Sequence, residues 1–253
     1  IDALRRSIPA PFDRDVECGP VVSDTVTLST FHGCPPDEIE AITRHLIDEH
    51  ELDVIVKLNP TLLGHARVAH LLHDVLGYRH VELVPSAFDE DLRFDRAIDL
   101  IGELSAHAAR QGRRFGVKLT NTLVVSNPGE RLPENRMYLS GQPLHVLAMA
   151  VAKELAAAIP GRLMLPGHDG DIQVSFSAGI SKENIVDAVA TGVQPATICS
   201  DLLRPGGYGR IEPMLRSLAD AVRASGSSDL STWRAKRLAE CRAEGHDDIV
   251  NAH

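Results

Sequence analysis

Two apolar segments of the chain each carry a lysine and an asparagine close to their carboxyl end. They are Asp53–Pro60 (DVIVKLNP) and Phe115–Thr122 (FGVKLTNT). Both have the composition of buried strands, and a lysine ammonium inside such a strand is costly unless a partner stabilises it. Strands that end in polar residues in this way are typical of an α/β barrel whose rim faces a polar ligand.

Strand-like apolar runs alternate along the chain with amphipathic helical segments. This alternation predicts a parallel sheet with helical crossovers. About six strands can be recognised, so we expect an α/β protein with a TIM-type (β/α)8 barrel that is only partly contained in this chain. The predicted strands are Thr25–Ser29, Asp53–Leu58, His80–Val84, Phe115–Leu119, Leu163–Leu165 or Gln173–Ser177, and Ala196–Ser200. The predicted helices are Pro36–Glu49, Gly64–Leu76, Phe94–Arg110, Pro143–Ala158, Lys182–Thr191 and Ile211–Ala224.

These elements suggest three regions: an N-terminal extension (residues 1–24), the barrel-like domain (25–224) and a polar, helical C-terminal tail (225–253). The tail carries Trp233, which we expect to dock on a neighbour or on a missing part of a longer chain. The first residue is Ile rather than Met, which is compatible with a processed product or a piece of a longer polypeptide.

Charge and composition exclude several classes of function. The 253 residues carry a formal net charge of −9 without a basic run, which argues against nucleic-acid binding. No apolar stretch approaches the ~20 residues of a membrane span and no signal-peptide pattern is present, so we expect a cytoplasmic protein. The four cysteines lack CxxC spacing, and we predict no metal site, including at the segment His168–Asp171 (HDGD).

The segment Thr27–Pro36 (TLSTFHGCPP) leaves a predicted strand and enters a predicted helix. Cys34 could protonate a substrate carbon, with His32 assisting it. The nearby helix N-terminus would lower the pKa of the Cys34 thiol. A tight turn around a small packed thiol is an equally good interpretation.

The two lysine-bearing strands suggest a ligand with an electron-poor ring. Lys57 could neutralise charge that develops on such a ring, and Asn59 could bind a heteroatom. Asn121 and Thr122 offer amide and hydroxyl groups suited to the edge of a heterocycle. The alternatives are a lysine paired with a carboxylate inside the barrel and a polar turn that ends a strand.

Two later segments could cradle a phosphate. They are Ser177–Ser181 (SAGIS) and Thr197–Tyr208 (TICSDLLRPGGY). Small residues after late strands, next to a helix start, leave backbone N–H groups free for an anion. Two ordinary glycine-containing loops would give the same pattern.

The order of these segments resembles the FMN-binding barrel shared by dihydroorotate and dihydropyrimidine dehydrogenases. More closely, it resembles the corresponding domain of the YgfK family of large iron–sulfur flavoproteins. The resemblance extends from about Val26 to Arg210. It depends on the segments Thr27–Ile42 (TLSTFHGCPPDEIEAI), Val56–Gly64 (VKLNPTLLG), Gly116–Leu123 (GVKLTNTL), Met137–Gly141 (MYLSG) and Asp201–Tyr208 (DLLRPGGY).

The resemblance implies roles for individual residues. In the family, the residue that corresponds to Lys57 contacts the pyrimidine edge of the flavin, and the residue that corresponds to Asn121 contacts the substrate. Cys34 is the best candidate in this chain for the family's catalytic cysteine or serine. Lys118 is expected to join the flavin site, and the flavin phosphate is expected at Ala178, Gly179, Cys199 and Ser200. This chain departs from the pattern in three ways: Ala178 replaces a glycine, the loop around Cys34 is shorter, and the early strands that hold one side of the flavin are missing.

We therefore expect an FMN-dependent oxidoreductase module that transfers hydride between FMN and a planar N-heterocycle at a CH–CH or CH–NH bond. Lys57 would stabilise negative charge, Asn59, Asn121 and Thr122 would hold the substrate, and Cys34 would donate the proton. The resemblance also implies iron–sulfur and FAD domains or subunits as electron-transfer partners. The alternatives are a non-catalytic scaffold or electron-transfer subunit with a degenerate flavin pocket and a Schiff-base aldolase or lyase using Lys118 or Lys57.

Overall fold

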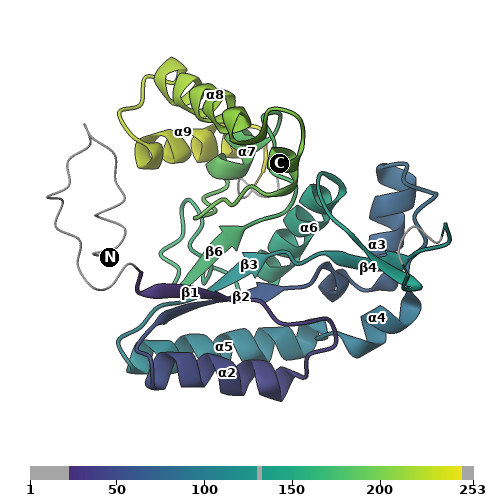
Figure 1. Ribbon diagram of the computed structural model, residues 1–253. Coiled ribbons are helices and arrows are strands. Elements are labelled where there is room, and N and C mark those ends of the chain that lie inside the picture. Colours follow the sequence, from purple (N-terminus) through teal and green to yellow (C-terminus); the bar gives the residue numbers. More distant parts are fainter. Residues whose placement is uncertain (1–22, 130–132, 247–253) are drawn as a thin grey trace, which may run out of the picture.

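The computed structural model describes residues 23–129 and 133–246. A parallel sheet with the strand order β1-β2-β3-β6 lies at its centre (Figure 1). Its strands are β1 (Thr25–Leu28), β2 (Asp53–Leu58), β3 (Phe115–Leu119) and β6 (Ile172–Phe176). A single parallel bridge from Phe176 to Ala196 continues the sheet beyond β6. The parallel sheet is thus the part of the predicted barrel that the described residues contain.

Two of the predicted strands need correction, and of the alternatives Leu163–Leu165 and Gln173–Ser177 the second corresponds to β6. Ala196–Ser200 forms only the bridge at Ala196, and Leu163 pairs with Ile172 without forming a strand of its own. His80–Val84 is not a strand of the central sheet. Its Leu83 instead makes an antiparallel bridge to Val125 of a hairpin that the sequence pattern did not predict, and a helix begins at Pro85.

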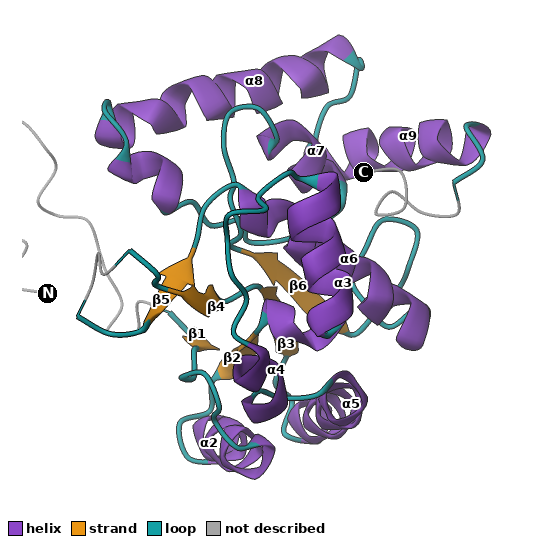
Figure 2. Cartoon of the chain, turned by 90° about the vertical axis from the view of Figure 1, so that its right-hand side faces the viewer, coloured by secondary structure: helices purple, strands orange, loops and turns teal. Residues whose placement is uncertain are grey.

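This hairpin consists of β4 (Leu123–Ser126) and β5 (Arg136–Leu139). Figure 2 shows it as a separate two-stranded sheet beside the central one. It begins after the three residues Thr120–Thr122 that follow β3, so it continues the segment in which the second lysine strand ends. The hairpin thereby brings Tyr138 close to the loop that follows β1, as shown below.

The two faces of the sheet differ in chemistry, because successive side chains of a strand point to opposite faces. One face packs on the helices and belongs to the hydrophobic core. The residues of that face are Val54, Val56, Leu58, Phe115, Val117, Leu119, Ile172, Val174 and Phe176. By alternation, the other face carries Thr27, Lys57, Lys118 and Ser175 and is therefore largely polar.

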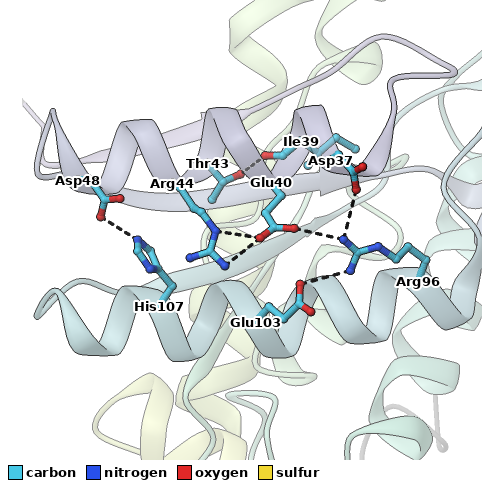
Figure 3. Close-up of polar contacts among 9 residues, drawn as sticks. All are labelled: Asp37, Ile39, Glu40, Thr43, Arg44, Asp48, Arg96, Glu103 and His107. Atoms are coloured by element: carbon cyan, nitrogen blue, oxygen red, sulfur yellow. Dashed lines mark hydrogen bonds and ion pairs between the residues drawn. The ribbon is translucent and has the colours of Figure 1, made fainter.

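Helices α2 (Pro36–Asp48) and α5 (Phe94–Arg110) lie side by side beneath the β1–β2 side of the sheet (Figure 1). Glu40 of α2 accepts hydrogen bonds from Arg44 of the same helix and from Arg96 of α5 (Figure 3). A second contact joins His107 to Asp48, with 2.7 Å between Nε2 and Oδ1. These polar contacts fix the two helices against each other along the outer side of the sheet.

The remaining helices follow the predictions with local differences. The predicted helix Gly64–Leu76 is divided into α3 (His65–Ala69) and a π-helical turn (His70–Val75), and α7 (Ile185–Ala190) begins later than Lys182. The predicted bounds of α5, α6 (Pro143–Ala158) and α8 (Ile211–Ala224) agree with the structure. Shorter elements are α4 (Pro85–Glu90) and the 3-10 turns η1 (Pro60–Leu63), η3 (Ser200–Leu203) and η4 (Gly207–Arg210).

The C-terminal tail packs on the domain itself. Its helix α9 (Leu230–Ala243) is capped by Asp229, whose carboxylate accepts the backbone N–H of Thr232. Trp233 is 2% exposed and belongs to the core, and the Arg234 guanidinium donates to the carbonyl of Val189. The expectation that Trp233 docks on a neighbour or a missing segment is therefore wrong. The predicted N-terminal extension lies outside the described residues except for Ser23 and Asp24.

Candidate functional site

Lys57 and Lys118 lie opposite each other in the register of β2 and β3. The Lys118 ammonium donates to Thr197 Oγ1 at 2.9 Å. Burial lowers the pKa of both lysines, and the charge of Lys57 lowers that of Lys118 further, whereas the Cys199 thiol partly offsets the shift at Lys57. Within the part of the chain that the structure describes, neither ammonium has a carboxylate partner. The pair can therefore stabilise an anionic or electron-rich group.

Polar groups follow both lysine strands. Asn59 comes directly after β2, and its side-chain amide makes no hydrogen bond to the described residues. The backbone N–H of Asn121 donates to the carbonyl of Leu58 at 2.7 Å, which joins the ends of β2 and β3. The Asn121 amide accepts the backbone N–H of Thr122 and lies 3.4 Å from the carbonyl of Thr30. The structure thus brings Asn121 and Thr122 beside the loop that follows β1.

Thr120 lies between Lys118 and Asn121 and is 2% exposed. Its hydroxyl oxygen is the one buried side-chain oxygen or nitrogen of the described residues that has no hydrogen-bond partner. Such a group carries a desolvation cost of about 1–3 kcal/mol until a partner is provided. An unpartnered hydroxyl at this strand end is compatible with a site that is completed by a ligand.

Residues from four segments meet around the buried carboxylate of Asp91. Asp91 Oδ1 accepts the backbone N–H of Gly33, and Oδ2 accepts the hydroxyl of Thr61, both at 2.7 Å. His32 Nδ1 lies 3.3 Å from Oδ2, and His32 Nε2 lies 3.4 Å from the hydroxyl of Thr122. Burial alone would raise the pKa of Asp91, but the hydrogen bonds from His32, Thr61 and Gly33 lower it below its ordinary value.

Cys34 lies in the hydrophobic core and is 4% exposed. Burial and the negative charge of Glu38 raise the pKa of its thiol, and these effects outweigh a hydrogen bond to Thr30. The predicted lowering of this pKa by the helix N-terminus is therefore wrong. Because α2 begins at Pro36 with Asp37 and Glu38 in its first turn, acidic side chains oppose the effect of the helix dipole at this end.

Residues of the two glycine-containing segments line one small cavity. Gly179, Ser181, Ser200 and Arg204 contribute to a cavity of about 30 Å³. Gly179 has φ +57°, and a Cβ atom there would lie 2.4 Å from the carbonyl oxygen of Gly141. Hydroxyl, guanidinium and backbone groups suit a phosphate in kind. The enclosed volume corresponds to about two water molecules, so a phosphate bound there would lie partly outside the cavity.

Ala178 and Cys199 flank this cradle in different ways. The methyl group of Ala178 is fully buried in the core, so it does not crowd the cavity, and its carbonyl lies 3.2 Å from His145 Nδ1. Cys199 is a free, exposed cysteine directly before η3. Thr197, two residues before Cys199, accepts the hydrogen bond from Lys118 and so brings this segment to the lysine strands. Both lysines and the cradle thus belong to the same edge.

A larger cavity lies elsewhere. It has a volume of about 800 Å³ and is lined by the first residues of β3, the segment before β6 and the start of α9, including Phe115, His168 and Arg234. These residues lie at the amino end of the strands, away from Lys57 and Lys118. Among the described residues no cluster of three potential ligands could hold a metal ion, and no helix is long and apolar enough to cross a bilayer.

Sequence patterns missed Asp91 and Tyr138. Asp91 ends the acidic run Asp89–Asp91, and acidic runs usually form solvated faces, so composition gave no reason to select it. Tyr138 belongs to the unpredicted hairpin, and its ring stacks on His32 with 5.6 Å between centroids. Both depend on long-range contacts that a linear pattern does not contain.

The chain matches the family described as "Oxidoreductase YgfK, N-terminal TIM-barrel domain" over residues 8–249. It is 44% identical over 214 residues to the YgfK proteins of Escherichia coli K12 and Escherichia coli O157:H7. The match covers 85% of this chain and 20% of each relative, so the chain spans about one fifth of their length. A dihydroorotate dehydrogenase from Eimeria tenella, solved with ferulenol, is 13% identical with a TM-score of 0.40, over 78% of this chain and 57% of that one. The family match confirms the resemblance and the barrel class inferred from the sequence.

Proposed function

Since the chain belongs to the family of N-terminal TIM-barrel domains of oxidoreductase YgfK, we propose that it is a flavin-dependent oxidoreductase module. The observation that supports this most strongly is the pair Lys57 and Lys118, side by side and without a carboxylate partner among the described residues. An FMN bound there would supply hydride transfer to or from a planar N-heterocycle, at a CH–CH or CH–NH bond.

Each site residue has a role in this proposal. Lys57 stabilises negative charge on the flavin ring, and Lys118 adds a second positive charge beside it. Asn59, whose amide has no partner in the described part of the chain, binds substrate together with Asn121 and Thr122. These amide and hydroxyl groups match the alternating donors and acceptors of a pyrimidine or purine edge.

The phosphate of FMN would be held at the segments that contain Ala178, Gly179, Cys199 and Ser200. The convergence of hydroxyl, guanidinium and backbone groups at the small cavity supports this assignment. Ser200 begins the 3-10 turn η3, so its N–H is not used by that turn. Gly179 is needed because a side chain would collide with Gly141.

The partners in this proposal are iron–sulfur and FAD electron-transfer domains or subunits. The chain spans about one fifth of the relatives it matches, so most of a relative's polypeptide lies outside the aligned region. An FMN module needs a route for two electrons to and from its ring. We propose that the remainder of such a polypeptide provides this path for the electrons.

Titration of FMN with the purified chain tests the proposal. Binding should quench flavin fluorescence and shift its visible absorption bands. Lys57→Met should weaken FMN binding at least about tenfold, which corresponds to ~1.4 kcal/mol. Lys153→Ala is the matched control, because Lys153 is an exposed lysine of α6, and it should bind FMN as the unmodified chain does.

Riboflavin serves as the second ligand, because it lacks the phosphate. Weaker binding of riboflavin than of FMN is expected if the cradle near Gly179 and Ser200 holds the phosphate. If the unmodified chain changes neither the fluorescence nor the visible absorption of FMN at millimolar FMN, the proposal that FMN is the cofactor is wrong.

Two specific observations favour other functions. The small enclosed volume at Gly179 and Ser200 favours a scaffold or electron-transfer subunit with a degenerate flavin pocket. A colourless chain that co-purifies with a flavin or iron–sulfur subunit would support that function. The lowered pKa of Lys57 and Lys118 favours a Schiff-base aldolase or lyase, which borohydride trapping of a carbonyl compound on either lysine would reveal.

A further inference from the structure

The carboxylate of Asp91 is held in a fixed position at the edge of the candidate site. Its side chain is 1% exposed. It receives the N–H of Gly33 and the hydroxyl of Thr61, which come from the segments after β1 and β2. Since these two donors bind different oxygens of the carboxylate, they restrict its rotation as well as its position.

This carboxylate determines which nitrogen of His32 carries a proton. The lowered pKa of Asp91 keeps it ionised, and an ionised carboxylate only accepts hydrogen bonds. His32 Nδ1, 3.3 Å from Oδ2, must therefore be the donor. In the neutral ring Nε2 is then an acceptor, and the Thr122 hydroxyl at 3.4 Å donates to it.

The ring of His32 also faces the segment expected to bind substrate. Thr122 directly follows Asn121, and the ring of Tyr138 stacks on the imidazole with an interplanar angle of 19°. The His32 side chain is 15% exposed, whereas Cys34 lies in the core two residues later. His32 is thus the accessible proton-bearing group of this loop, with its orientation fixed on two sides.

We propose that His32 is the proton-transfer group of this site and that Asp91 is its positioning residue. The identity of the substrate, a planar N-heterocycle, rests on the proposed function; the orientation of the ring does not. In the step, a bond from hydrogen to the substrate breaks and a bond from that hydrogen to Nε2 forms, or the reverse. The ring gains or loses one positive charge, and Asp91 remains ionised throughout.

Other charged groups near this pair compensate one another. Glu90 directly precedes Asp91, and its carboxylate pairs with Arg136 of β5 at 3.2 Å. Tyr138 lies two residues beyond Arg136 on the same strand. Among the described residues, the charged group in direct contact with the imidazole is therefore Asp91.

Nitrogen-15 NMR of the full chain with labelled histidine tests the proposal without flavin or substrate. The chain has 12 histidines, and the His32→Gln variant identifies the signals of His32 by their loss. At a pH where the ring is neutral, the unmodified chain should show a protonated Nδ1 and an unprotonated Nε2. Asp91→Asn should shift His32 toward the other tautomer, and Thr122→Val should move only the Nε2 signal.

A His32 ring with its proton on Nε2 in the unmodified chain, or identical signals in all variants, would overturn the assignment. If Asp91→Asn does not fold, Thr122→Val still gives a result, because Thr122 is only partly buried. In a preparation that binds FMN, His32→Gln should retain FMN affinity while turnover falls at least about 100-fold. Absence of FMN binding would contradict the proposed function but leave the NMR result unchanged, so the two failures can be distinguished.

Discussion

Lys57 is the residue on which the proposed chemistry depends most. It lies in a strand whose other residues, Asp53 to Leu58, are all buried, and burial lowers its pKa. A lysine in such a strand costs free energy unless a group of opposite charge compensates it. No carboxylate among the described residues does so, and in the proposed function the ligand is the compensating group.

Replacing Lys57 by alanine should abolish turnover without unfolding the domain. Loss of a positive charge beside a developing negative charge costs ~100-fold or more in rate. The free energy of unfolding should change by less than ~1 kcal/mol, because no ion pair with a described residue is broken. Steady-state kinetics and urea denaturation measure the two effects. Activity that equals that of the Lys153→Ala control would exclude the role of Lys57.

Gly179 should tolerate substitution less well than another glycine of similar backbone conformation. Gly179→Ala adds a Cβ atom 2.4 Å from a carbonyl oxygen, whereas Gly112 has φ +67° and open space around it. Both variants carry the strain of a positive φ, about 1 kcal/mol, and Gly179→Ala should lose a further ~1–3 kcal/mol. Chemical denaturation of the two variants measures this difference. Equal stabilities would mean that the loop of Gly141 moves away freely.

Individual elements differ in how well the sequence predicts them. The bounds of α5 and α6 follow from amphipathic patterns, and Pro143 marks the first turn of α6. β2 and β3 are apolar runs that end in polar residues, and they were also predicted with their observed bounds. Local pattern is sufficient for elements of this kind.

Elements that depend on distant partners were missed. His80–Val84 has the composition of a strand, but its partner is the hairpin strand β4 rather than the central sheet. For the site, the sequence predicted that the segments of Lys57, Asn121, Gly179 and Ser200 meet at one edge. It did not predict Asp91, because the role of this residue depends on contacts with Thr61 and His32, which lie 30 and 59 positions away in the sequence.

The contact between α5 and the segment before β6 should respond to acid. Arg162 donates to both oxygens of Asp171 and lowers its pKa to about 2, and Ser105 of α5 donates to the same carboxylate. Because the folded-state pKa is depressed, the stabilisation is present above the unfolded-state pKa of about 3.9 and is lost as pH falls toward about 2. The pair is partly exposed, so the effect is modest.

Thermal unfolding measured from about pH 5 to about pH 2 covers the unfolded-state and folded-state pKa values of Asp171 and therefore measures this contribution. The unmodified chain should lose more stability over this interval than Asp171→Asn does. Arg162→Gln should resemble Asp171→Asn in its pH dependence. Parallel curves for all three proteins would contradict the assigned origin of the shift.

At the scale of the whole molecule, the barrel-like domain and the tail form one packed structure. Trp233 and Cys241 of α9 belong to the same hydrophobic core as the residues of the central sheet. The helices α7, α8 and α9 lie together above β6 (Figure 1). The described chain should therefore unfold as one cooperative unit rather than as a domain with an independent appendage.

Trp233→Ala should destabilise the whole domain by about 3–5 kcal/mol, because it removes a large, fully buried side chain. Trp233→Phe, which keeps an aromatic ring at this position, should cost less. Urea denaturation followed by circular dichroism should show one transition shifted to lower urea for both variants. A separate early transition confined to α9 would indicate instead that the tail folds independently.

The pairing of Lys57 with Lys118 has a consequence for the solution behaviour of the domain. Two ammonium groups on adjacent strands repel each other, and neighbouring strands are only about 4.8 Å apart. Any multivalent anion that reaches them relieves this repulsion, so sulfate and inorganic phosphate should protect the fold against heat more than chloride does at equal ionic strength. Sulfate and phosphate also stabilise folded proteins in general, so the part of this protection that Lys57→Met loses reports on whether the positive pair is neutralised.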